Sequence, residues 1–187
     1  MSNFTALDIK RAEESLAPTT AYAPEKNLVS FELSLRDTKQ RANITEILVR
    51  DWLKNELGLD AELTGGREGG GFEAYDIECK LPSRGKLKTV RIECKSSLTC
   101  SYIWKRDGGI RFKFVGVKPK KFDYIFMFQV HPHDGLVVKW TTQKRIEQYI
   151  KSKSFTKQSH GFCITFADIN NVEGLELYDL EDFPNEV

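Results

Sequence analysis

The stretch YDIECKLPSRGKLKTVRIECKSS (residues 75–97) repeats the letters IECK, and it decides how the chain is expected to fold. In both copies apolar and charged residues alternate, as the side chains of a strand alternate between its two faces. The letters PSRG between the copies are typical of a turn. The stretch therefore predicts two antiparallel strands, over residues 73–81 and 88–96, joined by a short connection.

One face of these two predicted strands carries ionisable side chains. Asp76 lies on the first strand, and Glu93 follows 17 residues later on the second, with Lys95 on the same face. Carboxylates on adjacent strands suit a hard divalent cation such as Mg²⁺, and the backbone carbonyl of Cys94 would add another oxygen. Such a metal activates water for phosphodiester hydrolysis, while a lysine steadies developing charge. The alternative is an ordinary surface hairpin with Glu–Lys pairs across its strands.

The rest of the chain predicts a mixed α/β architecture, an α+β arrangement in which helices flank a mixed sheet. A helix is expected over residues 40–57, with Gly58 as its stop. The nearly continuous apolar run FDYIFMFQV (residues 122–130) predicts a central strand buried on both faces. The remaining expected elements are a hairpin over residues 101–117, strands over 135–140 and 162–166, and a short helix over 141–151.

The length of 187 residues predicts one domain. Residues 1–38 contain two prolines and many small polar residues, and an irregular N-terminal arm is expected there. Residues 39–187 are expected to form a single domain with an acidic C-terminal tail. No apolar run is long enough to cross a membrane, and the N-terminus lacks the apolar core of a signal peptide, so a cytoplasmic protein is expected.

The formal net charge of +1 conceals a strong asymmetry. Residues 76–121 contain 13 basic and 4 acidic residues, a net charge of +9, so the rest of the chain carries −8. Charged segments are common on solvated surfaces, but a basic segment around a carboxylate pair also suits binding of a polyanion. The side chains expected to contact DNA phosphates are Lys105, Arg106, Arg111, Lys113, Lys118, Lys120 and Lys121.

Glu46 is a further candidate because it lies on the apolar stripe of the first predicted helix, with Ala42 and Val49. A lone carboxylate on an apolar face is costly unless something pairs with it. Two partners are open. One is Arg50, one turn further along the same helix, and the other is the group of ionisable side chains on the two strands.

The order of these elements over residues 40–140 resembles the PD-(D/E)xK nuclease superfamily, the fold of many restriction endonucleases. The motif reads Asp76…Glu93-Cys94-Lys95 here, after a helix with a glutamate, and Tyr75 stands where many members have proline. The resemblance implies a restriction-endonuclease-like core. In that core Asp76 and Glu93 bind Mg²⁺, with Mn²⁺ as a substitute, Lys95 positions or activates the water, and Glu46 supports the site.

The resemblance also implies a metal-dependent endodeoxyribonuclease acting on double-stranded DNA. A type II restriction-like enzyme is favoured because the chain contains little beyond the expected catalytic core. Cutting both strands of a duplex implies a homodimer, since one such chain carries one site. Two alternatives stay open: a repair, recombination or phage nuclease acting on structured DNA, and a non-catalytic nucleic-acid-binding module with the same fold.

Overall fold

The computed structural model of the chain describes residues 8–9, 33, 35–64, 75–98, 112–131, 135–155, 157–159 and 161–184. Most of the N-terminal arm expected over residues 1–38 therefore lies outside the described residues. The elements in chain order are α3 (Thr38–Asn55), β1 (Asp60–Leu63), β2 (Ile77–Ser83), β3 (Lys86–Leu98), β4 (Phe112–Val117), η1 (Pro119–Lys121), β5 (Tyr124–His131), β6 (Gly135–Thr142), α4 (Gln143–Ser152), β7 (Lys157–Gln158), β8 (Gly161–Phe166) and η2 (Leu180–Asp182). None of the helices in these ranges combines the length and the apolar composition needed to cross a bilayer.

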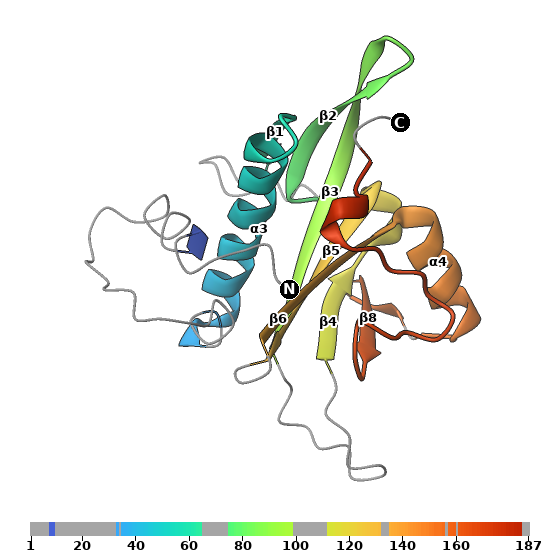
Figure 1. Cartoon of the computed structure of the whole chain (residues 1–187). Helices are drawn as coiled ribbons and strands as arrows, with labels where there is room; N and C mark the ends of the chain where they lie inside the picture. The colour runs from blue at the N-terminus through green and yellow to red at the C-terminus, as the bar shows by residue number, and fades with distance from the viewer. Residues whose placement is uncertain are drawn as a thin grey trace.

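The main sheet has five strands in the order β1-β2-β3-β5-β6 (Figure 1). β3 and β5 pair in parallel and the other neighbours pair antiparallel, so the expected mixed sheet is confirmed. A second sheet of three strands, in the order β4-β8-β7, was not expected. The described partner of β4 is β8, while the first arm of the hairpin expected over residues 101–117 lies outside the described residues.

The β2–β3 hairpin is tighter and longer than the sequence indicates. The turn consists of Arg84 and Gly85, whose φ angles are 46° and 76°. Two successive residues of positive φ are typical of the type I′ turn, whose twist matches that of antiparallel strands. β3 consequently has 13 residues, and in Figure 1 the hairpin extends beyond the other strands.

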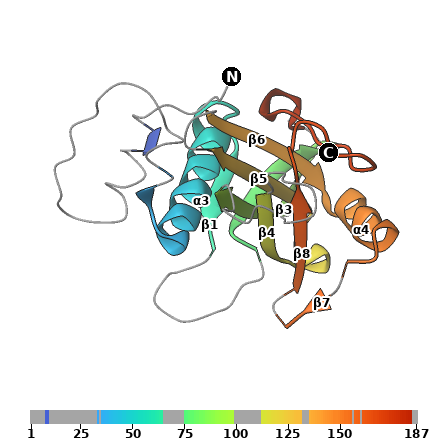
Figure 2. The same ribbon diagram turned by 90° about the horizontal axis from the view of Figure 1, so that it is seen from below.

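Two layers cover the main sheet, with α3 on one face and the second sheet with α4 on the other (Figures 1 and 2). Phe126 and Phe128 of β5 pack in the core beneath α3, whereas Ile125 and Met127 pack in the core beside β4, β8 and α4. β5 is therefore buried on both faces, which confirms the expectation for FDYIFMFQV. Tyr75, expected on the face of Ile77, packs instead against the second core, because it precedes the regular strand.

Both helices begin and end close to the expected positions. Asp37 and Gln40 form a capping box at the start of α3, and Gly58, with φ of 66°, lies just beyond its end. The side chain of Thr142 accepts a hydrogen bond from the Arg145 backbone N–H at the start of α4. These caps satisfy backbone N–H groups that have no partner within the helix.

The acidic C-terminal segment packs on β6 rather than forming a tail. Trp140 and Tyr178 exchange two backbone hydrogen bonds of 3.0 and 2.9 Å, and Lys139 forms an ion pair with Asp179. Phe183 is buried among aromatic rings that include Trp140. The expected tail is wrong because aromatic and aliphatic residues alternate with the acidic ones and anchor the segment to the core.

Candidate functional site

Four predicted catalytic residues lie together at the edge between β2, β3 and α3. We call Glu46, Asp76, Glu93 and Lys95 the carboxylate cluster. Glu46 comes from α3, Asp76 from the bend before β2, and the other two from β3. The charges of Asp76, Glu93 and Lys95 all act on Glu46. The structure thus brings residues as far apart as Glu46 and Lys95 into one electrostatic unit.

Asp76 is not on a strand, and this corrects the sequence-based placement. Its backbone N–H donates to the Ile92 carbonyl at 2.9 Å, but regular pairing begins only at Ile77. The Oδ2 atom of Asp76 accepts a hydrogen bond of 2.7 Å from the Cys94 backbone N–H. The Asp76 side chain therefore accepts the Cys94 N–H, which a backbone carbonyl would accept if β2 continued here. This hydrogen bond fixes the Asp76 carboxylate beside Glu93.

Cys94 contributes its backbone to this edge and its thiol to the core. The N–H and C=O of one strand residue point to the same edge, so the Cys94 carbonyl faces the side on which Asp76 lies. The Cys94 side chain is buried in the core beneath α3, and this burial raises the pKa of its thiol well above the ordinary range. The predicted oxygen donor is therefore well placed, whereas the thiol remains protonated and turned away.

Glu93 and Lys95 form an ion pair on the face of β3 opposite to Cys94. Glu93 is 5 % exposed, and burial is the main reason that its pKa is raised to about 7. Lys95 opposes this shift, while the negative charge of Asp76 adds to it. Burial lowers the pKa of Lys95, but the attraction of Glu93 and Asp76 outweighs it, and the pKa of Lys95 lies above its ordinary value. Lys95 is therefore a cation throughout the neutral range.

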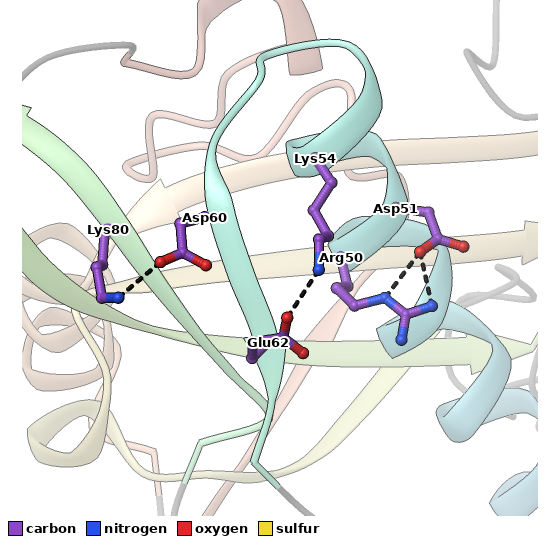
Figure 3. A network of polar contacts seen from close by, with 6 residues as sticks. All are labelled: Arg50, Asp51, Lys54, Asp60, Glu62 and Lys80. Atoms are coloured by element: carbon purple, nitrogen blue, oxygen red, sulfur yellow. Dashed lines mark hydrogen bonds and ion pairs between the residues drawn. The ribbon is translucent and has the colours of Figure 1, made fainter.

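Glu46 belongs to the carboxylate cluster and not to a helical ion pair. Figure 3 shows Arg50 directed at Asp51, with Nε and Nη2 at 2.7 and 2.6 Å from Oδ1. Burial, together with the negative charge of Asp76, raises the pKa of Glu46 to about 8. Among the described side chains Arg50 does not pair with Glu46, so the geometry decides between the two partners that the sequence left open.

The donor set and its charge fit a hard divalent cation. Three carboxyl groups face one ammonium group, so full ionisation of the carboxylate cluster leaves a net charge of −2 in a largely buried place. A divalent cation would neutralise this excess, and oxygen atoms are the ligands that Mg²⁺ and Mn²⁺ prefer. Within the described ranges, however, no three His, Cys, Asp or Glu side chains converge in an arrangement that would hold a metal without other donors. The Cys94 carbonyl is the additional oxygen that the sequence predicts.

The predicted DNA-contacting residues are only partly described. Lys105, Arg106 and Arg111 lie outside the described residues. Lys113 is exposed on β4, and Lys118, Lys120 and Lys121 are exposed in or beside η1. The positive charge of Lys118 opposes the raised pKa of Glu93 and is the weakest of the influences on it, after burial, Lys95 and Asp76.

Ser97 is a site residue that the sequence reasoning missed. It is 4 % exposed, and its Oγ accepts a hydrogen bond of 2.7 Å from the Lys113 backbone N–H. This contact ties β4 to β3 two residues after Lys95. Strand alternation could have identified it, because Glu93, Lys95 and Ser97 occupy the same face of β3.

Glu78 is a further carboxylate on β2, two residues after Asp76. It lies opposite Arg91 in the β2–β3 register, but Arg91 forms an ion pair of 3.1 Å with Asp123. The Tyr75 hydroxyl group lies 3.5 Å from Glu78. Glu78 therefore does not replace Asp76 as the carboxylate that receives the Cys94 N–H.

No family model matches this chain, and no curated protein matches its sequence.

Proposed function

We propose that this chain is a Mg²⁺-dependent endodeoxyribonuclease with a restriction-endonuclease-like catalytic core. The observation that supports this proposal best is the buried carboxylate cluster, in which three carboxyl groups and one lysine come from three different segments. A buried group with excess negative charge is costly to a folded protein unless it serves a ligand. A divalent cation bound beside a phosphodiester would use this charge.

Asp76, Glu93 and the Cys94 carbonyl would hold the cation. When bound, Mg²⁺ polarises a phosphoryl oxygen and lowers the pKa of water. Lys95 stays protonated because its pKa is raised, so it acts as a cation that holds a non-bridging phosphate oxygen and not as a base. Its ion pair with Glu93 fixes the position of the ammonium group before the substrate arrives.

Glu46 is suited to proton transfer because its pKa of about 8 lies near neutral pH. In hydrolysis a water oxygen attacks phosphorus, and the bond from phosphorus to the leaving sugar oxygen breaks. The attacking water loses one proton, and ionised Glu46 can accept it. The leaving oxygen takes up a proton from solvent. This assignment gives each member of the carboxylate cluster a separate task.

The substrate that we propose is double-stranded DNA, cut at a specific sequence by a homodimer. Exposed lysines on β4 and η1 lie on the side of β3 that carries Glu93, where phosphates of a duplex would pass. A nuclease for repair, recombination or phage DNA uses the same chemistry on branched substrates. The form of the products distinguishes these roles.

Cleavage of supercoiled plasmid and genomic DNA tests the proposal. Wild-type protein is incubated with Mg²⁺, Mn²⁺ or a chelator, beside Glu93→Gln as a variant of nearly equal shape without the charge. We expect discrete fragments with either cation and none with the chelator or the variant. Cleavage confined to branched DNA would assign a structured-DNA nuclease, and intact DNA with every cation and substrate would overturn the enzymatic assignment.

A non-catalytic nucleic-acid-binding module is the second candidate. It is favoured by the Lys95–Glu93 ion pair, which satisfies both groups without a metal, and by the lack of three converging ligand side chains among the described residues. DNA affinity measured with Mg²⁺ and with a chelator separates the two candidates. A module without catalysis binds equally in both conditions, whereas a metal site raises affinity when the cation offsets the carboxylates near the phosphates.

A further inference from the structure

A groove of about 590 Å³ lies between η1, the C-terminal half of α4 and the β7–β8 hairpin. Figure 2 shows β7, β8 and α4 at the same end of the molecule. The proposed cleavage reaction does not use this groove. Its walls come from segments as far apart as residues 117 and 162, so the fold and not one local motif creates it.

The rim of the groove is strongly basic. Five lysines border it: Lys118, Lys120, Lys121, Lys151 and Lys157. Among the described residues that line the groove, Glu147 is the one carboxylate, and it is paired with Lys151 at 3.1 Å. The other four lysines form no ion pair with any described residue. Four uncompensated ammonium groups around one concave surface favour a polyanion.

The floor of the groove is apolar. It is formed by Val117, Pro119, Ile150 and Phe162. A phosphate backbone alone would gain little from such a floor, and a duplex keeps the faces of its bases stacked inside. An unpaired strand exposes both its phosphates and its base faces, and proteins bind such strands with basic rims and apolar or aromatic floors.

Two features connect the groove with the carboxylate cluster: the charge of Lys118 and the path of β4. This lysine borders the groove, and its charge acts on Glu93. β4 leads into the groove at Val117, after its Lys113 amide has bonded to Ser97 of β3. A DNA strand that leaves the carboxylate cluster along β4 would therefore reach the basic rim of the groove next.

We propose that this groove binds an unpaired DNA strand that adjoins the phosphodiester at the carboxylate cluster. The inference rests on the proposed nuclease function, and within it favours the structured-DNA alternative, with a junction between duplex and single strand as the preferred substrate, over cutting of an unbroken duplex. Lys118, Lys120 and Lys157 hold the phosphates, and Phe162 supplies a face for a base. Electrostatic attraction by the rim and stacking on the floor act on the same strand.

Fluorescence anisotropy tests the inference without cleavage, because chelator is present throughout. The full chain is titrated with a blunt duplex and with the same duplex carrying a short unpaired DNA strand. We expect the unpaired strand to raise affinity about tenfold, the effect of one well-stacked base. For Lys120→Ala/Lys157→Ala this preference is lost, and the slope of log affinity against log salt falls by about 1.4, as expected for two single-strand phosphate contacts.

Two further variants test whether the preference for the unpaired strand depends on the groove or only on the positive charge of the protein. Phe162→Leu keeps an apolar side chain but removes the aromatic face, so it should reduce the preference for the unpaired strand and leave blunt-duplex binding unchanged. Lys153→Ala removes an exposed lysine that follows the same helix but does not border the groove, and it should preserve the preference. Thermal unfolding monitored by circular dichroism checks that each variant is folded.

The inference is overturned by equal affinity for the two DNA molecules, or by an equal loss in Lys153→Ala and the groove variant. Tighter binding of an RNA overhang than of the DNA overhang would also overturn it. These results are independent of catalysis. A protein that cuts DNA but shows no preference loses the groove assignment alone, whereas a protein with the preference but no cleavage under Mg²⁺ loses the nuclease assignment alone.

Discussion

Two groups of charged side chains border helix α3, and they differ in almost every physical respect. The surface ion-pair network consists of Arg50, Asp51, Lys54, Asp60, Glu62 and Lys80 (Figure 3). It contains three acids and three bases, paired at 2.6 to 2.7 Å. The carboxylate cluster contains three acids and one base, and it is largely buried. Positive and negative charges are thus equal in number in the surface ion-pair network and unequal in the carboxylate cluster.

The two groups shift pKa values in opposite directions. A hydrogen bond from Lys80 lowers the pKa of Asp60, whereas burial raises the pKa of Glu46 to about 8 and that of Glu93 to about 7. Exposed pairs stabilise a protein little, because water already solvates both partners. The comparison teaches that burial and charge balance identify the candidate site, since the number of charges near α3 does not.

The largest difference is expected for cleavage when an aspartate is neutralised in each group. Asp76→Asn should lower cleavage by about a thousandfold or more, the order expected when a central catalytic group is lost. The matched Asp60→Asn change, in an exposed pair beside the same helix, should leave cleavage unchanged. Rates of plasmid linearisation under single-turnover conditions measure both. Equal rates for the two variants would remove Asp76 from the catalytic machinery.

The next largest difference in cleavage rate is expected when one lysine is removed from each group, Lys95 from the carboxylate cluster and Lys80 from the surface ion-pair network. Lys95→Ala should lower the single-turnover rate by about a hundredfold, because one preorganised cation is lost from the transition state. DNA affinity in chelator should fall by a smaller factor than the rate, because Lys95 is already paired with Glu93 before DNA binds. Lys80→Ala removes an exposed lysine that is paired with Asp60, and it should keep the wild-type rate. A loss of binding in place of a loss of rate would make Lys95 a DNA-contacting residue only.

The pH dependence of stability should separate the two groups next. Because the folded pKa values of Glu46 and Glu93 exceed those of the unfolded chain, the folded state binds protons more tightly. Their stabilising effect is complete below the unfolded pKa of about 4.3 and is lost as pH rises through 7 and 8. Without metal, the free energy of unfolding should therefore fall by on the order of 6 kcal/mol between pH 5 and pH 8, because each unit of pKa shift is worth about 1.4 kcal/mol.

Urea denaturation across that pH range measures this effect. Mg²⁺ should stabilise the protein more at pH 8 than at pH 6, because metal binding requires ionised carboxylates. Glu46→Gln removes one of the titrating groups, so it should flatten the decline and make the metal-free protein more stable at pH 8. A profile in which Glu46→Gln matches the wild type at every pH would contradict the assigned burial of charge.

Much of the fold could be predicted because local periodicity determines it. The alternation in residues 75–97 and the apolar run of β5 identify the strands that carry the site, and the stripe on α3 singles out Glu46. These are patterns of one element each. The structure brings the four predicted residues together, and their catalytic role stays a prediction.

The features that sequence could not provide depend on which elements meet. Nothing in the sequence distinguishes Asp51 from Glu46 as the partner of Arg50, because both lie within reach on a helix. The pairing of β4 with β8 joins segments about fifty residues apart, and it creates a second sheet without a local signal. Asp76 lies before β2 because its side chain, and not a backbone carbonyl, accepts the Cys94 N–H. Only the three-dimensional structure shows this contact. Lys151 and Lys157 join the groove for the same reason.

The smallest effect is expected within the surface ion-pair network itself. Lys54 Nζ and Glu62 Oε1 are 2.7 Å apart, with 40 % and 53 % of their side chains exposed. A double-mutant cycle of Lys54→Ala and Glu62→Ala should give a coupling energy of about 0.2–1 kcal/mol, and high salt should reduce it, because water and ions screen an exposed pair. Chemical denaturation of the four proteins provides the values. A coupling energy several times larger would mean that the network holds β1 against α3, and the contrast with the carboxylate cluster would then rest on charge balance alone and not on exposure.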